Sequence, residues 1–315
     1  MLDVFLIIFT IYILGIISFI IFFKPLYILK DKGWFISKIV GLVVLSTFVW
    51  IITLLTPIPN LSYVWRSTFV LLFIISVLVL IFSDNRKDIK SFFMENKFQI
   101  LLFEFIFILI FSIFLLLRVY DNNAIGTEKP MDSMMLNAVF NSYNTPPVDL
   151  WMSGNTISYY YFGYWIFGGF YSILFSETSN LYNISFSLIP ALSAISALSF
   201  VFNFISFKRK DKSRYIKPLF ISIITPVFLI FSSNLYGLLL IIERIPFVPL
   251  SLLNWINGEK HISIVNYQYF IPSDFWWWWK SSRVINSFNN NESIDFTINE
   301  FPYFSFLLGD FHPHM

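Results

Sequence analysis

The chain of 315 residues is 57% hydrophobic and only 13% charged, which excludes a soluble globular protein, because such proteins carry about 25% charged residues. Its net charge is only +2, and its basic residues lie in short loops between apolar segments, so nucleic acid is excluded as a partner. The absence of cysteine excludes disulfides, thiolate metal ligands and cysteine nucleophiles. With a mean hydropathy of +0.71, most of the chain is expected to lie in a lipid bilayer.

Six long apolar segments predict membrane-spanning helices, because a helix of about 20 apolar residues crosses the hydrocarbon core. They cover residues 2–23, 36–56, 67–82, 98–118, 182–206 and 218–242. The third is short and can extend toward Trp65. A seventh candidate, residues 158–175, is aromatic and interrupted by glycines. The expected fold is therefore all-α, a polytopic bundle of about six to seven spans in the cell membrane.

Lysine and arginine in short loops predict which ends of these spans face the cytoplasm. Such residues gather in the loops 24–38, 83–97 and 207–217. The N-terminus and two long polar loops, residues 119–157 and 243–302, are then expected outside.

This orientation requires an odd number of crossings between residues 157 and 207, although two candidate spans lie there. Either the segment 158–175 is re-entrant or juxtamembrane, or the basic loop 207–217 departs from the rule. The glycines at positions 163, 168 and 169 favour the first alternative, since irregular backbone is tolerated at membrane depth when protein surrounds it.

The first outer loop contains two carboxylates with a lysine between them, Glu128, Lys129 and Asp132. Pro130 predicts the start of a short interfacial helix over residues 131–141. Carboxylates four residues apart share one helix face, where one can act as general base while the other tunes its pKa. The plainer alternative is a helix start with solvated charges.

A second polar cluster, Asp310, His312 and His314, lies near the end of the sequence. In an extended backbone these alternating residues point to one side, and Pro313 disfavours helix just before it. One carboxylate and two imidazoles are a reasonable ligand set for a divalent ion. The alternative is a polar turn at the membrane surface.

Aromatic and charged residues near the predicted membrane boundaries have two interpretations each. Tyr159, Tyr160 and Tyr161 are either an aromatic belt or a wall for a lipid or sugar ligand. The tryptophans 276–279 are expected to anchor at the interface, and Arg283 after them can hold a phosphate. Glu104 lies in the middle of a predicted span, where it is either functional or paired inside the bundle.

Four motifs in this chain resemble those of the YYY family of uncharacterised membrane proteins. They are EKPMD at 128–132, YYYFG at 159–163, WWWWKSSRVI at 276–285 and NEFPYFSFLLGDFHPHM at 299–315. The resemblance covers about residues 98–315, and residues 1–97, an N-terminal region of three spans, either stand apart from it or belong to it as well. Members of that family are much longer, so the chain resembles their N-terminal part, incomplete at its C-terminus.

The YYY family is in turn distantly similar to GT-C glycosyltransferases, which take sugars from polyprenyl-phosphate donors outside the cytoplasm. The similarity implies that Asp132 or Glu128 deprotonates an acceptor hydroxyl. It also implies that Lys129 or Arg283 neutralises phosphate. If the tyrosines 159–161 form the wall of a ligand site, they contact the substrate. The residues Asp310, His312 and His314 would hold the donor phosphate or a divalent ion such as Mg²⁺ or Mn²⁺. This is an analogy at the level of the fold, and the reaction does not follow from it alone.

The alternative function is a transporter or flippase-like protein for a lipid or polar solute, with Glu104 and the segment 158–175 lining a pathway. Geometry separates the two. An enzyme requires Glu128, Asp132, Asp310 and the two histidines to lie close together. A transporter requires Glu104 to face a polar cavity, and an assembly protein would have neither feature.

Overall fold

The computed structural model describes residues 2–207, 216–232, 249, 251, 288–289, 292–293 and 302–312. The chain divides into two compact units. Unit 1 comprises Met1–Pro226 together with Gly309–Pro313 and Met315, and unit 2 comprises Val227–Leu308 and His314. The domain boundary predicted at residue 97 falls inside unit 1 and stays a prediction.

The predicted all-α membrane fold is confirmed by five long helices in unit 1. They are α1 (Leu2–Phe22), α2 (Ser37–Leu55), α3 (Ser62–Phe82), α5 (Lys97–Tyr120) and α8 (Leu181–Ser206). Among the described residues, these five are long and apolar enough to cross a membrane. α3 begins before Trp65, so the extension expected for the short third segment is present.

The predicted span 218–242 is described only in its first half. It contains α9 (Ile216–Val227) and the π-helical turn η2 (Phe228–Ser232), and residues 233–242 lie outside the described part. In unit 2, α13 (Pro302–Leu308) contacts η2, and the two-residue strands β1 (Phe288–Asn289) and β2 (Glu292–Ser293) pair in antiparallel fashion.

The segment 158–175 contains a helix that is too short to cross a membrane. α7 (Phe162–Ser172) has 11 residues, or about 16 Å of helix against about 30 Å of hydrocarbon. Only α8 is then long enough to cross between residues 157 and 207. One crossing is an odd number, as the predicted orientation requires. α7 packs against α2, α3, α6 (Lys129–Asn141) and α8. Its Gly169 allows close approach, since a Cβ there would lie 1.9 Å from Cζ2 of Trp65.

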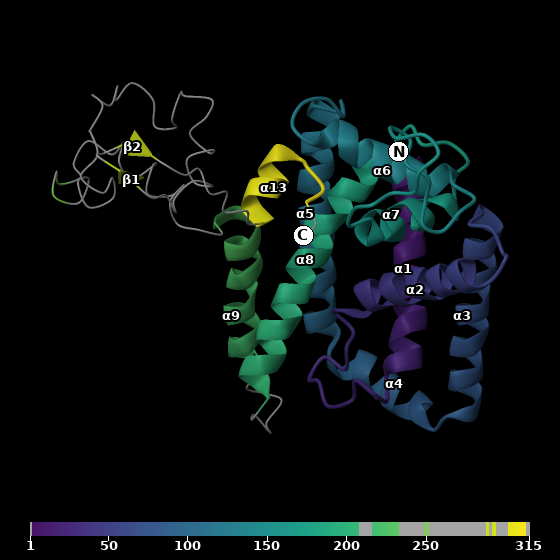
Figure 1. Ribbon diagram of the computed structural model, residues 1–315. Coiled ribbons are helices and arrows are strands. Elements are labelled where there is room, and N and C mark those ends of the chain that lie inside the picture. The colour runs from purple at the N-terminus through teal and green to yellow at the C-terminus, as the bar shows by residue number, and fades with distance from the viewer. Residues whose placement is uncertain are drawn as a thin grey trace. The chain divides into compact units, whose positions relative to one another are not determined.

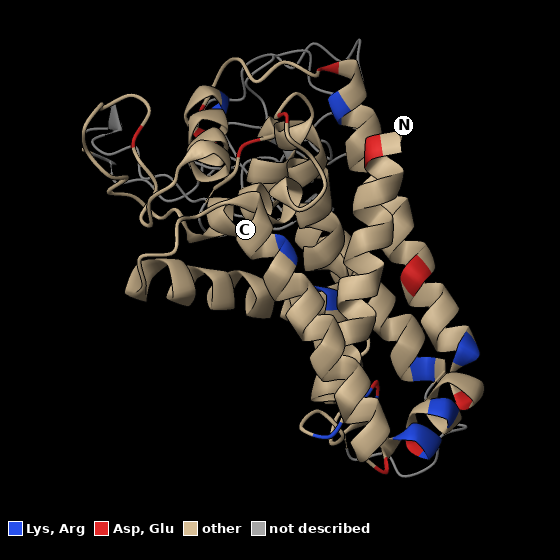
Figure 2. Ribbon diagram, turned by 90° about the vertical axis from the view of Figure 1, so that its right-hand side faces the viewer, with Lys and Arg blue, Asp and Glu red and all other residues tan. Residues whose placement is uncertain are grey.

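The Lys and Arg residues of unit 1 are unequally distributed between its two ends. In Figure 1, α6 and α7 lie at the end opposite α4 (Asn85–Glu95), and α2 runs across α1 rather than along it. Figure 2 shows most of the Lys and Arg ribbon at the end that carries α4. That end is the one predicted to be cytoplasmic, so the α6–α7 end is the predicted outer end.

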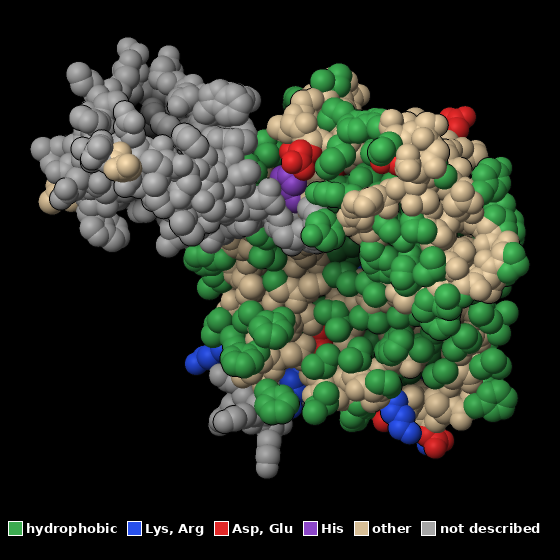
Figure 3. All heavy atoms as spheres, in the orientation of Figure 1, with side chains coloured by type: hydrophobic (Ala, Val, Ile, Leu, Met, Phe, Trp, Pro, Cys, Tyr) green, Lys and Arg blue, Asp and Glu red, His purple; other side chains and the backbone are tan. Residues whose placement is uncertain are grey.

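Apolar side chains cover much of the outside of the long helices. Figure 3 shows hydrophobic groups over most of the described face, with charged groups mainly toward its two ends. Large exposed side chains such as Leu71, Phe73 and Phe105 would be costly in water and are stable against lipid. The chain is therefore a multi-pass membrane protein.

Lys38 is not in the basic loop where the sequence suggested it, but in the first turn of α2, with 2% exposure. Its Nζ lies 2.8 Å from Oε1 and 2.7 Å from Oε2 of Glu104 in α5. Trp34 Nε1 also donates to Oε1 of Glu104, at 2.9 Å. Glu104 is thus paired inside the bundle, which is one of the two interpretations given above. The pairing is needed because a lone carboxylate at this depth would be costly.

Candidate functional site

Two polar segments that are far apart in the sequence meet at the α6–α7 end of unit 1. One runs from Gly126 into the first turn of α6, and the other is the non-helical segment Gly309–His312. Gly126, Thr127 and Gly309 have positive φ angles of 81°, 51° and 81°, which turn the backbone sharply at the start of each segment. The helix predicted over 131–141 is present as α6, and its apolar side is buried in protein, with Met135 and Ala138 at 4% and 0% exposure.

Asp132 lies at the contact between these two segments and is completely buried. Its Oδ2 accepts a hydrogen bond from the backbone N–H of Phe311 at 2.8 Å. Its Oδ1 lies 2.6 Å from the hydroxyl oxygen of Tyr164, which comes from α7. The pKa of Asp132 is raised to about 7, mainly by burial and to a lesser extent by the negative charges of Asp310 and Glu128, while the two hydrogen bonds oppose this rise.

Asp310 is held beside the start of α6 by a threonine and a lysine. Its Oδ1 accepts a hydrogen bond from the hydroxyl of Thr127 at 2.6 Å and lies 3.6 Å from Nζ of Lys129. Lys129 Nζ also donates to Oγ1 of Thr127 at 3.1 Å. Both charged side chains are buried, and Oδ2 of Asp310 has no hydrogen-bond partner. The charge of Lys129 is therefore already balanced within the protein.

Glu128 and His312 form a second contact between the segments. Nε2 of His312 lies 3.4 Å from Oε2 of Glu128. The Glu128 side chain is 49% exposed, whereas that of His312 is 5% exposed. Glu128 is thus the carboxylate of this cluster that an outside molecule can reach.

The structure brings together the predicted residues Glu128, Lys129, Asp132, Asp310 and His312. The predicted residues His314 and Arg283 lie outside the described part of the chain, as do the tryptophans 276–279. Their roles stay predictions.

A divalent ion fits the described residues poorly. Among them, no group of three or more His, Asp or Glu is arranged to hold a metal ion. Oδ2 of Asp310 is free to coordinate one, but the ammonium of Lys129 already lies beside this carboxylate. A site that includes His314 stays a prediction.

Sequence reasoning missed three side chains at this site. Tyr164 follows the YYYFG motif directly, and its hydroxyl lies 2.8 Å from the carbonyl oxygen of Phe311 as well as beside Asp132. The Tyr182 hydroxyl donates to the carbonyl oxygen of Gly309 at 2.5 Å. Arg118, at the outer end of α5, lies beside Gly309. The one available signal was Arg118, a basic residue at the end of a span where the orientation rule does not place it.

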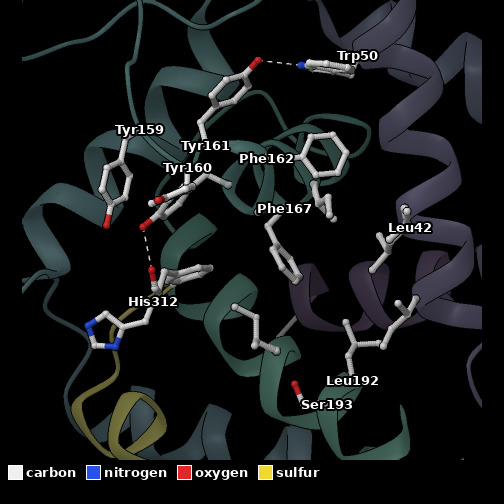
Figure 4. A pocket seen from close by; sticks show the side chains of 17 residues that line it. Leu42, Trp50, Tyr159, Tyr160, Tyr161, Phe162, Phe167, Leu192, Ser193 and His312 are labelled. Carbon is white, nitrogen blue, oxygen red and sulfur yellow. Dashed lines mark hydrogen bonds between the residues drawn. The ribbon is translucent and has the colours of Figure 1, made fainter. Parts of the chain in front are cut away.

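A cavity of about 610 Å³ lies beside this polar cluster. Tyr159, Tyr160 and Tyr161 line it, and in Figure 4 Tyr159 and His312 lie on one side, opposite Leu42 and Leu192. The hydroxyl of Tyr161 accepts a hydrogen bond from Nε1 of Trp50 at 2.8 Å. Most of the lining is apolar, from the following residues: Ile39, Leu42, Val43, Trp50, Phe162, Ile166, Phe167, Ile189, Leu192 and Phe311. The cavity suits an apolar chain, with His312 at its polar edge.

Comparison with known proteins connects the chain to one family. The family model described as Uncharacterized membrane protein (DUF2298) matches residues 44–315. No curated protein and no solved structure matches the chain.

Proposed function

We propose that this chain, which belongs to the family of uncharacterized membrane proteins DUF2298, is a membrane enzyme that transfers a sugar from a polyprenyl-phosphate donor to an acceptor hydroxyl. The proposed reaction is similar to that of the GT-C glycosyltransferases and would take place at the predicted outer face. The observation that carries the proposal is the Glu128–His312 pair at the edge of a mostly apolar cavity. Such an arrangement suits a substrate with a long apolar part and a polar reacting end.

The apolar part of the donor fits the cavity by chemistry and by location. Its volume of about 610 Å³ accommodates several isoprene units, and its lining is dominated by aliphatic and aromatic side chains. A nucleotide sugar would leave these apolar groups without a partner and would bring two phosphates into an apolar space. A lipid-linked donor therefore fits better than a nucleotide-linked one.

Glu128 fits the role of general base better than Asp132. Asp132 is completely buried and has both oxygens in hydrogen-bond contact with Phe311 and Tyr164. Glu128 is half exposed and contacts His312, so it can accept a proton from an arriving hydroxyl. Asp132 instead holds the 309–312 segment against α6, which makes it a positioning residue.

The proposed step is a single displacement. Glu128 takes the proton of the acceptor hydroxyl, whose oxygen forms a bond to the anomeric carbon of the sugar. The bond between that carbon and the phosphate oxygen breaks at the same time, and polyprenyl phosphate leaves as the anion. His312, which lines the cavity, holds the carboxylate of Glu128 beside it through their contact of 3.4 Å.

The alternative function, a transporter or flippase-like protein, has less support. It needs Glu104 in a polar cavity, but Glu104 is bound by Lys38 and Trp34. Glu104 lines neither the cavity beside the polar cluster nor a second described cavity, which lies next to Phe200 and Asn203.

The test is a transfer assay with the full-length protein in membranes that hold a radiolabelled polyprenyl-phosphate sugar. We expect Glu128→Gln to lower transfer by about 100-fold or more, since a general base contributes about that factor. Asp310→Asn, which weakens the contact with Lys129, is expected to lower it as well. Asp121→Asn is the matched control, because this exposed carboxylate lies in the same loop. Transfer by Glu128→Gln at the rate of the unmodified protein would overturn the proposal.

A further inference from the structure

Arg118 is buried at the outer end of α5 without a carboxylate partner. Its Nε donates to Oδ1 of Asn183 at 2.8 Å, and its Nη2 donates to the carbonyl oxygen of Asn123 at 2.9 Å. The residue is 5% exposed, yet no carboxylate of the described residues lies within ion-pair distance of it. Its Nη1 donates to none of the described acceptors. A buried guanidinium without an opposite charge is costly, so this position favours an anionic ligand.

The environment of Gly309 provides a second unsatisfied group. A Cβ on Gly309 would lie 3.4 Å from Nη1 of Arg118 and 3.4 Å from Cε of Lys129, so the backbone passes between two basic side chains. In the next residue, Oδ2 of Asp310 is buried and has no hydrogen-bond partner. One point of the chain therefore carries a free donor and a free acceptor, which a ligand with both an anionic group and a hydroxyl would satisfy.

Charge balance distinguishes Arg118 from Lys129. Lys129 is compensated by Asp310 at 3.6 Å and also bonds Thr127. Within the part of the chain that the structure describes, Arg118 has only neutral partners, namely two asparagines and the ring of Tyr182, whose centroid lies 5.4 Å from Cζ. The positive charge of Arg118 is therefore the one left for a ligand.

We propose that Arg118 binds the phosphate group of the lipid-linked donor. This inference rests on the proposed function and names a residue that recognises its substrate. A guanidinium matches phosphate by paired, charge-assisted hydrogen bonds. Asp310 Oδ2 then accepts a hydrogen bond from a hydroxyl of the attached sugar.

The position of Arg118 relative to the cavity is consistent with one ligand occupying both. Phe311 lines the cavity, and its ring packs against that of Tyr182, with centroids 5.2 Å apart. The other neighbour of the Tyr182 ring is the Arg118 guanidinium. The rings of Phe311 and Tyr182 thus lie between the apolar cavity and the cation, so a lipid whose tail occupies the cavity would carry its phosphate past this aromatic pair to Arg118.

The test measures binding rather than transfer. The full-length protein in detergent is titrated with a fluorescent polyprenyl phosphate, and then with polyprenol and with inorganic phosphate as competitors. We expect polyprenyl phosphate to bind about tenfold or more tightly than polyprenol, and Arg118→Gln to abolish this preference. Arg66→Gln is the control, because this arginine in α3 is exposed and bonds only the backbone carbonyl of Ile173.

Two results would overturn the inference. One is an unchanged preference for the phosphorylated lipid in Arg118→Gln, and the other is equal binding of polyprenol and polyprenyl phosphate by the unmodified protein. Competition by inorganic phosphate as strong as that by the lipid would contradict a lipid-borne phosphate.

A second measurement needs no variant, in case Arg118→Gln fails to fold. Modification of Arg118 by phenylglyoxal in the unmodified protein is followed by mass spectrometry. Polyprenyl phosphate should slow it and polyprenol should not, and equal rates would refute the inference. Full sugar transfer by Arg118→Gln would refute the role of Arg118 but leave the proposed enzyme intact. Phosphate-dependent lipid binding by the unmodified protein without any sugar transfer would refute the proposed enzyme but leave the role of Arg118 intact.

Discussion

Asp132 and Phe311, 179 positions apart in the chain, are joined by a hydrogen bond of 2.8 Å from the backbone N–H of Phe311 to Oδ2 of Asp132. The hydroxyl oxygen of Tyr164 lies 2.6 Å from the other oxygen of Asp132 and 2.8 Å from the carbonyl oxygen of Phe311. A phenol has one proton and can donate to only one of these acceptors. An ionised Asp132 accepts this proton and leaves the carbonyl oxygen of Phe311 without it, whereas a protonated Asp132 can itself donate to Tyr164, which then donates to Phe311, so that all three groups are paired.

This arrangement predicts how substitutions at Asp132 affect stability. Asparagine has the shape of a protonated aspartic acid, so its amide can donate to Tyr164 while its oxygen accepts from Phe311. We expect Asp132→Asn to change the free energy of unfolding by less than about 1 kcal/mol, and Asp132→Ala to lower it by about 2–4 kcal/mol, because two buried groups lose their partner. Thermal unfolding in detergent measures both. Equal losses in the two variants would contradict a neutral Asp132.

The raised pKa of Asp132 also predicts a dependence of stability on pH. The native state keeps a proton that the unfolded state releases above its ordinary pKa of 3.8, and burial raises the native pKa to about 7. The stabilisation is therefore complete below about pH 4 and is lost as the pH rises through about 7. The melting temperature of the unmodified protein should fall relative to that of Asp132→Asn between about pH 4 and pH 8. Parallel curves for the two proteins would rule this out.

Removing one partner of the ion pair between Lys38 and Glu104 should destabilise the protein strongly, whereas replacing both partners with apolar residues should cost little. Lys38 is 2% exposed, so removing Glu104 alone leaves a buried ammonium without its opposite charge. We expect Glu104→Leu or Lys38→Met to lower the free energy of unfolding by about 3–5 kcal/mol, and the double variant Lys38→Met, Glu104→Leu to recover most of that loss. The readout is a double-mutant cycle of thermal unfolding, and losses that simply add would disprove the coupling.

Two glycines of α7 offer a test of its packing. A Cβ on Gly169 would lie 1.9 Å from Cζ2 of Trp65, whose Nε1 is fixed by a hydrogen bond of 2.8 Å to Asn60. Gly169→Ala is therefore expected to destabilise the protein by about 1–3 kcal/mol or more. Gly163→Ala in the same helix is the control, because nothing lies within 4 Å of its Cβ position. Similar melting temperatures for both variants would show that α7 does not pack as described.

Most of the fold follows from the length of the apolar segments, since a run of about 20 apolar residues has few stable alternatives to a spanning helix. α7 was ambiguous for a physical reason. Glycines such as Gly169 weaken an isolated span, but the same absence of a side chain permits contact with Trp65, and only the three-dimensional structure distinguishes the two effects. Lys38 was assigned to a loop because its partner Glu104 is remote in the sequence.

The candidate site was partly predictable. Two polar motifs on the same predicted side of the membrane indicated that Glu128 and Asp132 lie near Asp310 and His312. The division of roles among the carboxylates was not predictable, because it depends on which oxygen atoms the backbone of Phe311 and the hydroxyl of Thr127 already occupy. Those contacts come from residues that no spacing rule connects.

The most direct test of the whole account is a cross-linking measurement between Glu128 and His312, whose side chains lie 3.4 Å apart. These 315 residues contain no cysteine, so a pair of substitutions, Glu128→Cys and His312→Cys, is not obscured by other thiols of this region. We predict that a short bifunctional thiol reagent cross-links the two cysteines in intact cells, and that a membrane-impermeant thiol reagent added outside beforehand blocks this cross-link. Absence of the cross-link, or protection from the external reagent, would contradict a single site at the outer face.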